Sequence, residues 1–213
     1  MIKENFVFLR EFLLEFQTTG ACFPTSRWAA EALTDPLRVS GRPPKRILEL
    51  GPGTGAVTVK ILADMQPGDS LTVCEINPRF MKALKEKLAK LKDFQAHAKN
   101  VHFFEGPMQE MPEDTQYDVI VCALPFLNFP LEMVQEIFAK LRRLSTPDTL
   151  MTYYEYIGLR RVSKAVAPTA RKQRMREIDG YMKSLAERIR LGRTRVWLNI
   201  LPINIYTVKP AAA

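Results

Sequence analysis

The chain of 213 residues suits one domain that is large enough to bury a substantial core. Its 46% hydrophobic and 25% charged residues are ordinary for a globular protein, and no run of about 18 uncharged apolar residues predicts a membrane-spanning helix. Three cysteines and two isolated histidines predict neither a disulfide framework nor a metal site.

Residues 1–35 are expected to form an N-terminal helical segment. Apolar side chains within residues 1–19 recur at spacings of three and four, as on an amphipathic helix: Phe6, Leu9, Phe12, Leu13 and Phe16. Further apolar residues widen this face beyond one stripe. The helix therefore either packs inside the fold or meets a bilayer interface as a membrane and substrate lid. A second helix is expected over residues 27–33, with Thr25 or Ser26 as its N-cap.

Residues 46–65 predict a strand, a glycine turn and a helix. The short apolar run 46–50 suits a buried parallel strand, and residues 54–65 follow a helical pattern. Between them stand Gly51, Gly53 and Gly55, which permit positive backbone angles and let the main chain approach a ligand at the helix N-terminus. This arrangement opens a nucleotide-binding βαβ unit, with a tight turn that binds nothing as the alternative.

The alternation of strands and helices continues to the end of the chain. Further strands are expected at 71–75, 101–105, 117–124 and 149–154, helices at 78–91, 131–144 and 169–191, and two last strands at 196–201 and 203–208, joined at Pro202. The prediction is one α/β domain whose main part spans residues 45–213. Its core is a Rossmann-like, doubly wound, seven-stranded sheet with a C-terminal β-hairpin, and the ligand crevice lies at the carboxyl ends of the strands.

The net charge of +8 is concentrated in one segment. Residues 160–195 contain twelve Lys or Arg against three acidic residues, so this segment carries +9 and the rest of the chain −1. We expect an anionic surface as the partner of this segment, with a solvated helix face as the alternative.

The glycine spacing and two acidic residues narrow the ligand. The glycines fall at every second position, Glu49 stands two places before the first, and Glu75 closes the second strand. A dinucleotide fingerprint would instead place its last glycine three positions after the second. The pattern resembles motif I of class I S-adenosylmethionine-dependent methyltransferases. The resemblance implies that Glu49 helps to hold the methionine end of this cofactor and that Glu75 accepts its ribose hydroxyls.

The same resemblance implies the remaining cofactor contacts. They come from Gly51, Pro52, Gly53 and Gly55 in the turn, from Ile76 after Glu75, from Met108 beside the adenine, and from Ala123 and Leu124 near the transferable methyl group. The acid that often follows the third strand in this family is replaced by Pro107. An adenine contact there must therefore come from Met108 or from the main chain.

Three stretches resemble the bacterial phospholipid N-methyltransferases, which methylate phosphatidylethanolamine. They are residues 124–130 (LPFLNFP), residues 8–27 with their FLREFL, GA and PTSR elements, and residues 197–206 (WLNILPINIY). The sequence departs from that family after the fifth strand, at residues 153–156. A related amino lipid, such as an ornithine lipid, is therefore the alternative substrate.

The implied activity is N-methylation of an amino headgroup at a membrane surface. Candidates for gripping the amine are Tyr153, Tyr154, Glu155 and Tyr156, although strand alternation sends Tyr153 and Glu155 to one face and the other two to the opposite face. Pro125, Asn128, Arg160 and Arg161 are the substrate-binding candidates, the arginines for a lipid phosphate or carboxylate.

The expected location is the cytoplasm, with peripheral association to the cytoplasmic face of the inner membrane. Arg10, Glu11 and Glu15 interrupt the apolar N-terminal run, so no secretory signal is expected. The expected partners are an anionic membrane surface and an amino-lipid substrate.

The rival function is RNA (adenine) N-methylation, or RNA binding by a methyltransferase-like protein, through the same basic segment. Nucleobase methyltransferases place Asn or Asp where this chain has Ala123, and alanine cannot accept a hydrogen bond from the target amine. Nucleic acid is therefore an unlikely partner. A small-molecule amine methyltransferase is the third alternative, and the sequence predicts no oligomeric state.

Overall fold

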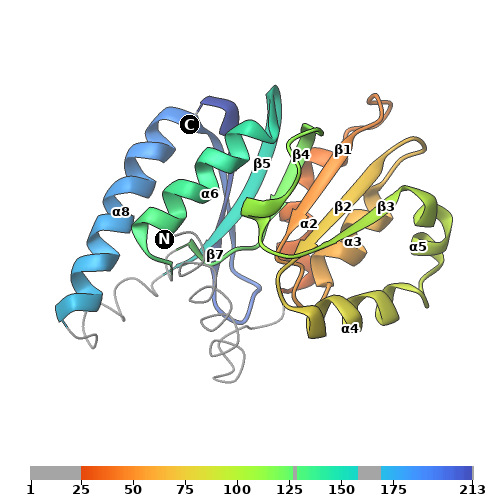
Figure 1. Ribbon diagram of the computed structural model, residues 1–213, viewed down its shortest axis with the longest axis horizontal. Coiled ribbons are helices and arrows are strands. Elements are labelled where there is room, and N and C mark those ends of the chain that lie inside the picture. Colours follow the sequence, from red (N-terminus) through yellow and green to blue (C-terminus); the bar gives the residue numbers. More distant parts are fainter. Residues whose placement is uncertain (1–24, 127–128, 158–168, 213) are drawn as a thin grey trace.

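One sheet of seven strands organises the protein. The computed structural model describes residues 25–126, 129–157 and 169–212, and for residues 169–172, 174 and 175 it describes the backbone alone. The strand order is β3-β2-β1-β4-β5-β7-β6 (Figure 1). The strands are β1 Arg46–Leu50, β2 Ser70–Glu75, β3 Val101–Glu105, β4 Tyr117–Cys122, β5 Ser145–Tyr156, β6 Arg190–Val196 and β7 Ile203–Val208.

The first five strands are parallel, whereas β7 runs antiparallel to both β5 and β6. This topology confirms the predicted Rossmann-like α/β sheet and its antiparallel C-terminal hairpin. The predicted N-terminal amphipathic helix of residues 1–19 lies outside the described residues.

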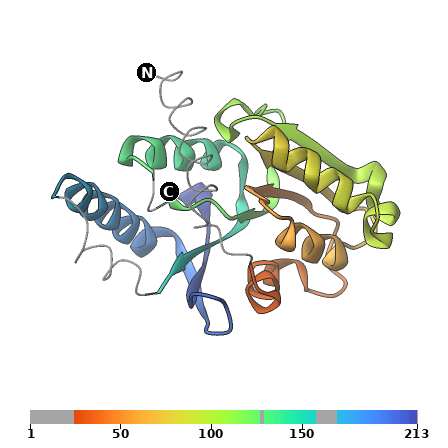
Figure 2. The ribbon, with the colours of Figure 1, turned by 90° about the horizontal axis from the view of Figure 1, so that it is seen from below.

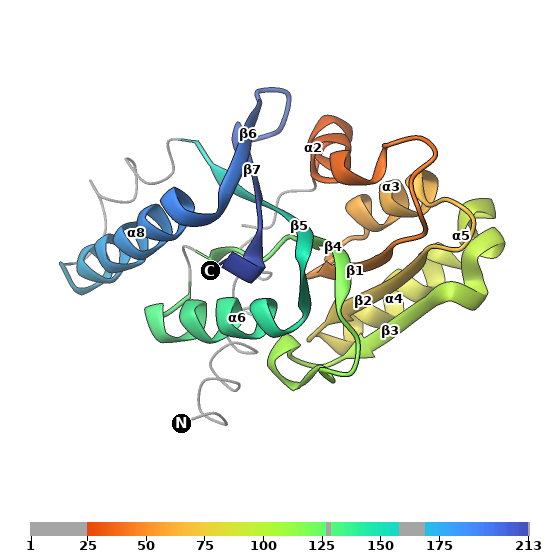
Figure 3. The same ribbon diagram turned by 90° about the horizontal axis from the view of Figure 1, so that it is seen from above.

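Helices cover both faces of the sheet. They are α2 Arg27–Leu33, α3 Ala56–Asp64, α4 Pro78–Leu88, α5 Lys92–His97, α6 Leu131–Arg143 and α8 Thr169–Ile189, with short 3₁₀ turns at Asp35–Leu37, Ala98–Asn100, Met108–Glu110 and Pro210–Ala212. One apolar core joins the sheet to α6 and α8, and a second core joins it to α2, α3 and α4. Figure 3 shows α2 and α3 on the face of the sheet opposite to α6.

The last hairpin corrects the sequence prediction. Residues 196–201 were expected to form its first strand, but β6 ends at Val196 and residues 197–202 form the loop. The apolar pattern that favoured a strand there belongs to exposed side chains, Trp197, Leu198 and Ile200. Charged residues such as Arg193 and Arg195 instead fill β6, because an edge strand is held by its backbone pairing with β7 and its side chains stay in water.

Other boundaries differ by smaller amounts. Helix α4 ends at Leu88 instead of residue 91, and a short unpredicted helix, α5, follows it. Strand β4 ends at Cys122 instead of residue 124, α8 ends at Ile189, and β5 begins four residues early at Ser145. Local pattern defines the ends of elements poorly, since terminal turns depend on tertiary contacts.

Helix α2 docks on the sheet through specific hydrogen bonds. Ser26 is its N-cap, as one of the two predicted candidates, and accepts from the Ala29 N–H at 3.2 Å. At its other end the Thr152 hydroxyl of β5 donates to the Leu33 carbonyl at 2.7 Å, and the Thr34 hydroxyl bonds Asp64 at 2.7 Å. The described part of the segment 1–35 thus packs onto the same sheet as the rest of the domain.

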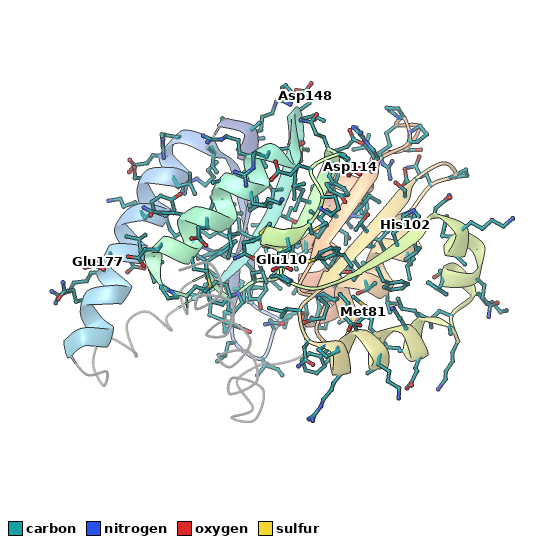
Figure 4. All side chains as sticks on the ribbon, viewed as in Figure 1. Met81, His102, Glu110, Asp114, Asp148 and Glu177 are labelled. Carbon is teal, nitrogen blue, oxygen red and sulfur yellow. The ribbon has the colours of Figure 1, made fainter. Side chains whose placement is uncertain are left out.

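A buried ion pair closes the amino edge of the sheet. Arg42 Nη1 and Nη2 bond the two oxygens of Asp69 at 2.8 and 2.6 Å, and Asp69 also accepts the N–H groups of Lys45 and Gln66. Both charged side chains are almost inaccessible. Burial alone would raise the pKa of Asp69, but these bonds outweigh it and hold the pKa below its ordinary value. Figure 4 marks Asp114 and Asp148 near this edge, where β4 and β5 begin.

We expect Asp69→Asn to lower the free energy of unfolding at pH 7 by about 3 kcal/mol or more, because it leaves the Arg42 guanidinium buried without its counter-ion. Since the folded pKa is depressed, the difference from wild type is present above about pH 4 and shrinks as the pH falls below it. Urea unfolding measures it. Asp35→Asn, which breaks the exposed pair with Arg38, is the control and should cost less than about 1 kcal/mol. Equal losses for the two variants would contradict the assignment.

Candidate functional site

The site lies where the parallel strands end. The loops that leave these strands are tied to neighbouring strand ends: Gly51 N–H donates to Cys74 O at 3.0 Å, Ala123 N–H to Leu50 O at 2.9 Å, and Gly106 N–H to Glu75 O at 3.0 Å. The carboxyl ends of β1, β2, β3 and β4 therefore meet at one edge, the lower edge in Figure 1. This is the edge at which open α/β sheets bind ligands.

The three glycines of the turn after β1 have different neighbours. All have positive φ angles, 70°, 53° and 75° for Gly51, Gly53 and Gly55. A Cβ at Gly55 would lie 2.3 Å from Leu84 Cδ1 of α4, and one at Gly51 would lie 3.1 Å from Leu124 Cδ2. A Cβ at Gly53 meets nothing within 4 Å. A side chain at Gly51 or Gly55 would therefore have to displace a leucine, whereas Gly53 presents bare main chain to an open space.

One hydrogen bond within the turn and one from α4 hold its shape. Gly55 N–H donates to Pro52 O at 2.9 Å within the turn, and Lys87 of α4 donates through Nζ to Thr54 O at 2.8 Å. Lys87 was not singled out from the sequence, because its contact with the turn is tertiary and no local motif marks it. The Lys87 ammonium also lies close enough to Glu49 to counter part of the rise that burial causes in the pKa of that carboxyl.

The Glu49 carboxyl is fully buried at the end of β1. Neither of its oxygens has a hydrogen-bond partner within the described part of the chain, and neither does the neighbouring Thr58 hydroxyl. Burial, with a smaller effect from Glu75, raises the pKa of Glu49 to about 8, although Thr58 lies close enough to lower it without meeting hydrogen-bond geometry. A buried carboxyl without partners is costly, so Glu49 fits a ligand that brings a cation and hydrogen-bond donors to this point.

Glu75 ends β2 beside the same turn. It is buried, and its Oε1 accepts the Asn77 N–H at 2.8 Å. Burial raises its pKa, and backbone hydrogen bonds from Asn77, Gly53 and Ile76 offset part of that rise. The Gly53 N–H thus lies close to this carboxylate, so Glu75 and the glycine turn are neighbours. The structure thus brings together Glu49, Glu75 and the glycine turn, as the sequence predicted, while the individual cofactor contacts stay predictions.

The other predicted cofactor residues form an apolar wall. Met108 is buried in the core under α6, and Ile76 and Leu124 pack against that core half-buried. Ala123 and Pro125, which flank Leu124, are also half-buried. Such a wall suits the flat face of a base better than a charged group. Asn128, Arg160 and Arg161 lie outside the described residues.

The tyrosines of β5 divide between the two faces of the sheet. Tyr153 stacks on Tyr206 with 5.2 Å between ring centroids and meets the edge of Phe126, which follows β4, at 5.7 Å. Tyr154 and Tyr156 pack against the opposite core, with 5.4 Å between their own centroids. The predicted alternation is confirmed, so these four candidates cannot serve one acceptor site together.

A pocket of about 190 Å³ opens beside Tyr153 and Glu155. Its walls include Tyr206 of β7, Lys183 and Glu187 of α8, and Arg190 of β6. The sequence predicted Tyr153 and Glu155 as site residues. It did not predict the pocket residues of α8, β6 and β7, because these elements reach β5 only through tertiary packing. The pocket offers both signs of charge and aromatic surface, which suits a polar, zwitterionic group.

The described residues contain neither a membrane-spanning helix nor a metal-ligating cluster. None of the helices in those residues is long and apolar enough to cross a membrane. The same residues contain no group of three or more metal-ligating side chains. The prediction that the protein uses no metal stays a prediction.

Similarity to known proteins agrees with this site. Residues 48–151 match a family described as a methyltransferase domain. The chain is 27% identical over 148 residues to an ornithine lipid N-methyltransferase of Singulisphaera acidiphila, covering 69% of this chain and 75% of that protein. It is 29% identical over 100 residues to the ribosomal RNA small subunit methyltransferase A of Malacoplasma penetrans, covering 47% of this chain and 32% of that protein.

A solved structure shares the fold. An O-methyltransferase from Bacillus cereus in complex with SAH has a TM-score of 0.64 at 15% identity, covering 94% of this chain and 90% of that one. Together with the order of the strands, these matches show that the chain contains a methyltransferase domain with the Rossmann-like fold, and its glycine turn and two carboxylates resemble those of the class I S-adenosylmethionine-dependent methyltransferases. Within that class it resembles the amino-lipid N-methyltransferases.

The residues of the site fit S-adenosylmethionine. Its methionine end carries an ammonium group, which can form an ion pair with the unpartnered Glu49 carboxyl. Its ribose offers two hydroxyl donors, which a carboxylate such as Glu75 accepts. The bare main chain at Gly53 leaves room for the cofactor to lie against the turn.

We expect Glu49→Gln to stabilise the cofactor-free protein relative to wild type as the pH rises. The folded pKa of Glu49, about 8, lies above the unfolded value, so wild type loses stability progressively as the pH climbs from about 4.5 through 8. The variant has no such group. Between pH 6 and 9 the difference should therefore grow by about 2–3 kcal/mol in urea unfolding.

The same variant should bind S-adenosylmethionine at least tenfold more weakly at pH 8, because an amide cannot neutralise the ammonium group. Isothermal titration calorimetry measures this. A pH-independent difference in stability together with unchanged cofactor affinity would show that Glu49 is only a structural carboxyl.

We expect Gly53→Ala to separate stability from cofactor binding. A side chain at a φ of 53° costs about 1 kcal/mol and also fills the space that the cofactor requires. Gly41→Ala is the matched control, since its φ is 68°, its Cβ would also meet nothing within 4 Å, and it lies in the loop before β1. Both variants should unfold at similar urea concentrations, and only Gly53→Ala should lose cofactor affinity, by tenfold or more. Equal affinities would place the cofactor elsewhere.

Proposed function

We propose that the protein transfers a methyl group from S-adenosylmethionine to the amine of an amino-lipid headgroup, phosphatidylethanolamine or an ornithine lipid. The observation that carries this proposal is the similarity to an ornithine lipid N-methyltransferase, which extends over 69% of this chain and 75% of that protein. The extent includes more than the cofactor-binding half that all class I methyltransferases share. The site around Tyr153 and Glu155 supports it.

For methyl transfer the protein must mainly align the amine with the methyl group and remove a proton from the amine. The bound cofactor supplies a methyl group on a sulfonium, whose bond to sulfur breaks with its electron pair as the amine nitrogen bonds the carbon. The amine arrives largely as ammonium and must first lose a proton. In this proposal the carboxylate of Glu155, which is buried and lines the pocket with Tyr153, attracts the ammonium and accepts that proton. Tyr153 and Phe126 provide a wall that excludes water.

The structure of the β4 loop weighs against a nucleobase acceptor. Ala123 donates its N–H to Leu50, and its methyl side chain offers no acceptor to a target amine. RNA methylation is nevertheless the second candidate, because a ribosomal RNA methyltransferase matches 47% of this chain. The two candidates share the cofactor site and differ only in the acceptor.

Membrane attachment completes the proposal. Interface binding needs an apolar element and a cationic element, and each basic residue near an anionic leaflet adds about 1 kcal/mol. Residues 160–195, with a net charge of +9, are the cationic element. In this proposal the protein acts from the cytoplasm, at the cytoplasmic face of the inner membrane. Arg160 and Arg161 are the proposed partners of the lipid phosphate or carboxylate.

The deciding measurement follows methyl-labelled S-adenosylmethionine with purified protein and, in parallel reactions, a total lipid extract and total RNA. We expect label in a lipid whose headgroup carries a free amine. Vesicles of pure phosphatidylcholine should take up none, since its nitrogen is already fully methylated. The Gly53→Ala protein is the inactive control. Label in RNA alone would transfer the function to the second candidate, and label in neither fraction would point to a small soluble amine.

A further inference from the structure

The loop between β6 and β7 exposes an unusual amount of apolar surface. Trp197, Leu198 and Ile200 are 62%, 62% and 59% exposed, and Trp28 of α2, next to this loop, is 41% exposed. We call these four side chains the apolar loop patch. The other large hydrophobic residues that stand exposed in the described part of the chain lie away from this loop, Val39 before β1 and Leu191 at the start of β6. Large apolar side chains gathered at one exposed point are typical of an interaction surface.

The loop is held in place although its apolar side chains face solvent. Asn199 accepts the Ser26 N–H through Oδ1 at 2.9 Å and donates through Nδ2 to the Leu201 carbonyl at 2.9 Å. Ile157 N–H after β5 donates to the Pro202 carbonyl at 2.7 Å. Figures 2 and 3 show the loop beside α2 in both views. Asn199 thus fastens the loop to the start of α2, and the patch projects from a fixed base.

The patch lies at the same edge as the cofactor site. β7 begins at Ile203, opposite Tyr156, and Asn204 stands opposite Glu155. Because β5 is parallel to β1 and β4, its end at Tyr156 marks the carboxyl edge of the sheet. The patch and the Glu155 end of the pocket therefore lie toward the same edge of the sheet.

Cationic side chains accompany the patch. The Arg27 guanidinium lies 4.4 Å from the centroid of the Trp28 ring, and Arg193 and Arg195 are exposed on β6 shortly before the loop. Residues 188–202 contain four arginines and no acidic residue. Tryptophan and aliphatic side chains next to arginines are the composition that settles at the headgroup level of an anionic bilayer.

We propose that the apolar loop patch inserts into the interfacial layer of an anionic membrane and sets the open edge of the sheet against the headgroups. The purpose of this docking rests on the proposed function, since only a lipid acceptor needs the site at the bilayer. A fixed loop loses little conformational entropy on insertion, and the headgroup amine reaches the pocket without leaving its leaflet. A protein partner or a second copy of this chain on the same patch is the competing outcome.

The two tryptophans make the docking directly visible. Trp28 and Trp197 are the only ones in the chain, so Trp28→Phe leaves Trp197 as the single emitter. We expect its fluorescence to shift to the blue with vesicles of phosphatidylglycerol and phosphatidylethanolamine, and to be quenched when their acyl chains are brominated. Trp197 that stays unquenched while the protein sediments with these vesicles would overturn the proposal.

Paired variants test the patch by vesicle affinity. Leu198→Ser with Ile200→Ser should weaken binding to the same vesicles about tenfold or more, because both side chains lose their apolar contact with the bilayer. Val39→Ser with Leu191→Ser, which removes side chains of equal exposure away from the patch, should change the vesicle affinity less than twofold. Both proteins should bind S-adenosylmethionine like wild type. Equal vesicle affinities, or a change in oligomeric state in place of vesicle binding, would overturn the docking.

The outcomes separate this inference from the proposed function. If wild type inserts Trp197 into vesicles but labels no lipid, the docking stands and the lipid acceptor falls. If wild type labels a lipid while the two double variants bind vesicles alike, the function stands and the docking falls.

Discussion

Glu49 and Glu75 end two neighbouring parallel strands, both buried and both beside the same glycine turn. Burial raises the pKa of both carboxyls, and the nearby Glu75 adds to the rise at Glu49. The fold tolerates this because Glu75 receives backbone hydrogen bonds. Glu49 receives none from the described residues. The partnerless Glu49 carboxyl thus destabilises the apoprotein at the position where a cationic cofactor would pair with it, so the cofactor's affinity and the apoprotein's stability are linked.

The rest of the architecture supports that point from several directions. The turn keeps its shape because Leu84 and Lys87 of α4 pack on it and bond to it. At the opposite edge, the buried Arg42–Asp69 pair secures the loops before β1 and β2, which lie far from the chemistry. The glycine turn, the Glu155 end of the pocket and the apolar loop patch all lie at the carboxyl edge.

Sequence reasoning succeeded where a local rule carries the information. The spacing of Gly51, Gly53 and Gly55 predicted the strand, turn and helix around them, and Ser26 was one of two predicted N-caps for α2. It failed for β6. The apolar run that follows Val196 has the pattern of a strand but forms a loop, whereas the charged run before Val196 lacks that pattern and forms the strand. Backbone pairing with its neighbour determines where an edge strand forms, and the side chains of the strand itself do not indicate that pairing.

The sequence by itself determined the fold class, most of the strands and helices along the chain and the composition of the glycine turn, because glycine geometry and apolar periodicity act over a few residues. Only the tertiary structure decided which groups meet: Lys87 at the turn, α8 against Tyr153 and Glu155, and Asn199 at the start of α2. It also decided that Glu49 is buried without a partner, whereas the chain shows only an acid before a glycine. Burial and pairing depend on contacts between residues far apart in the chain, and a local pattern contains no record of those contacts.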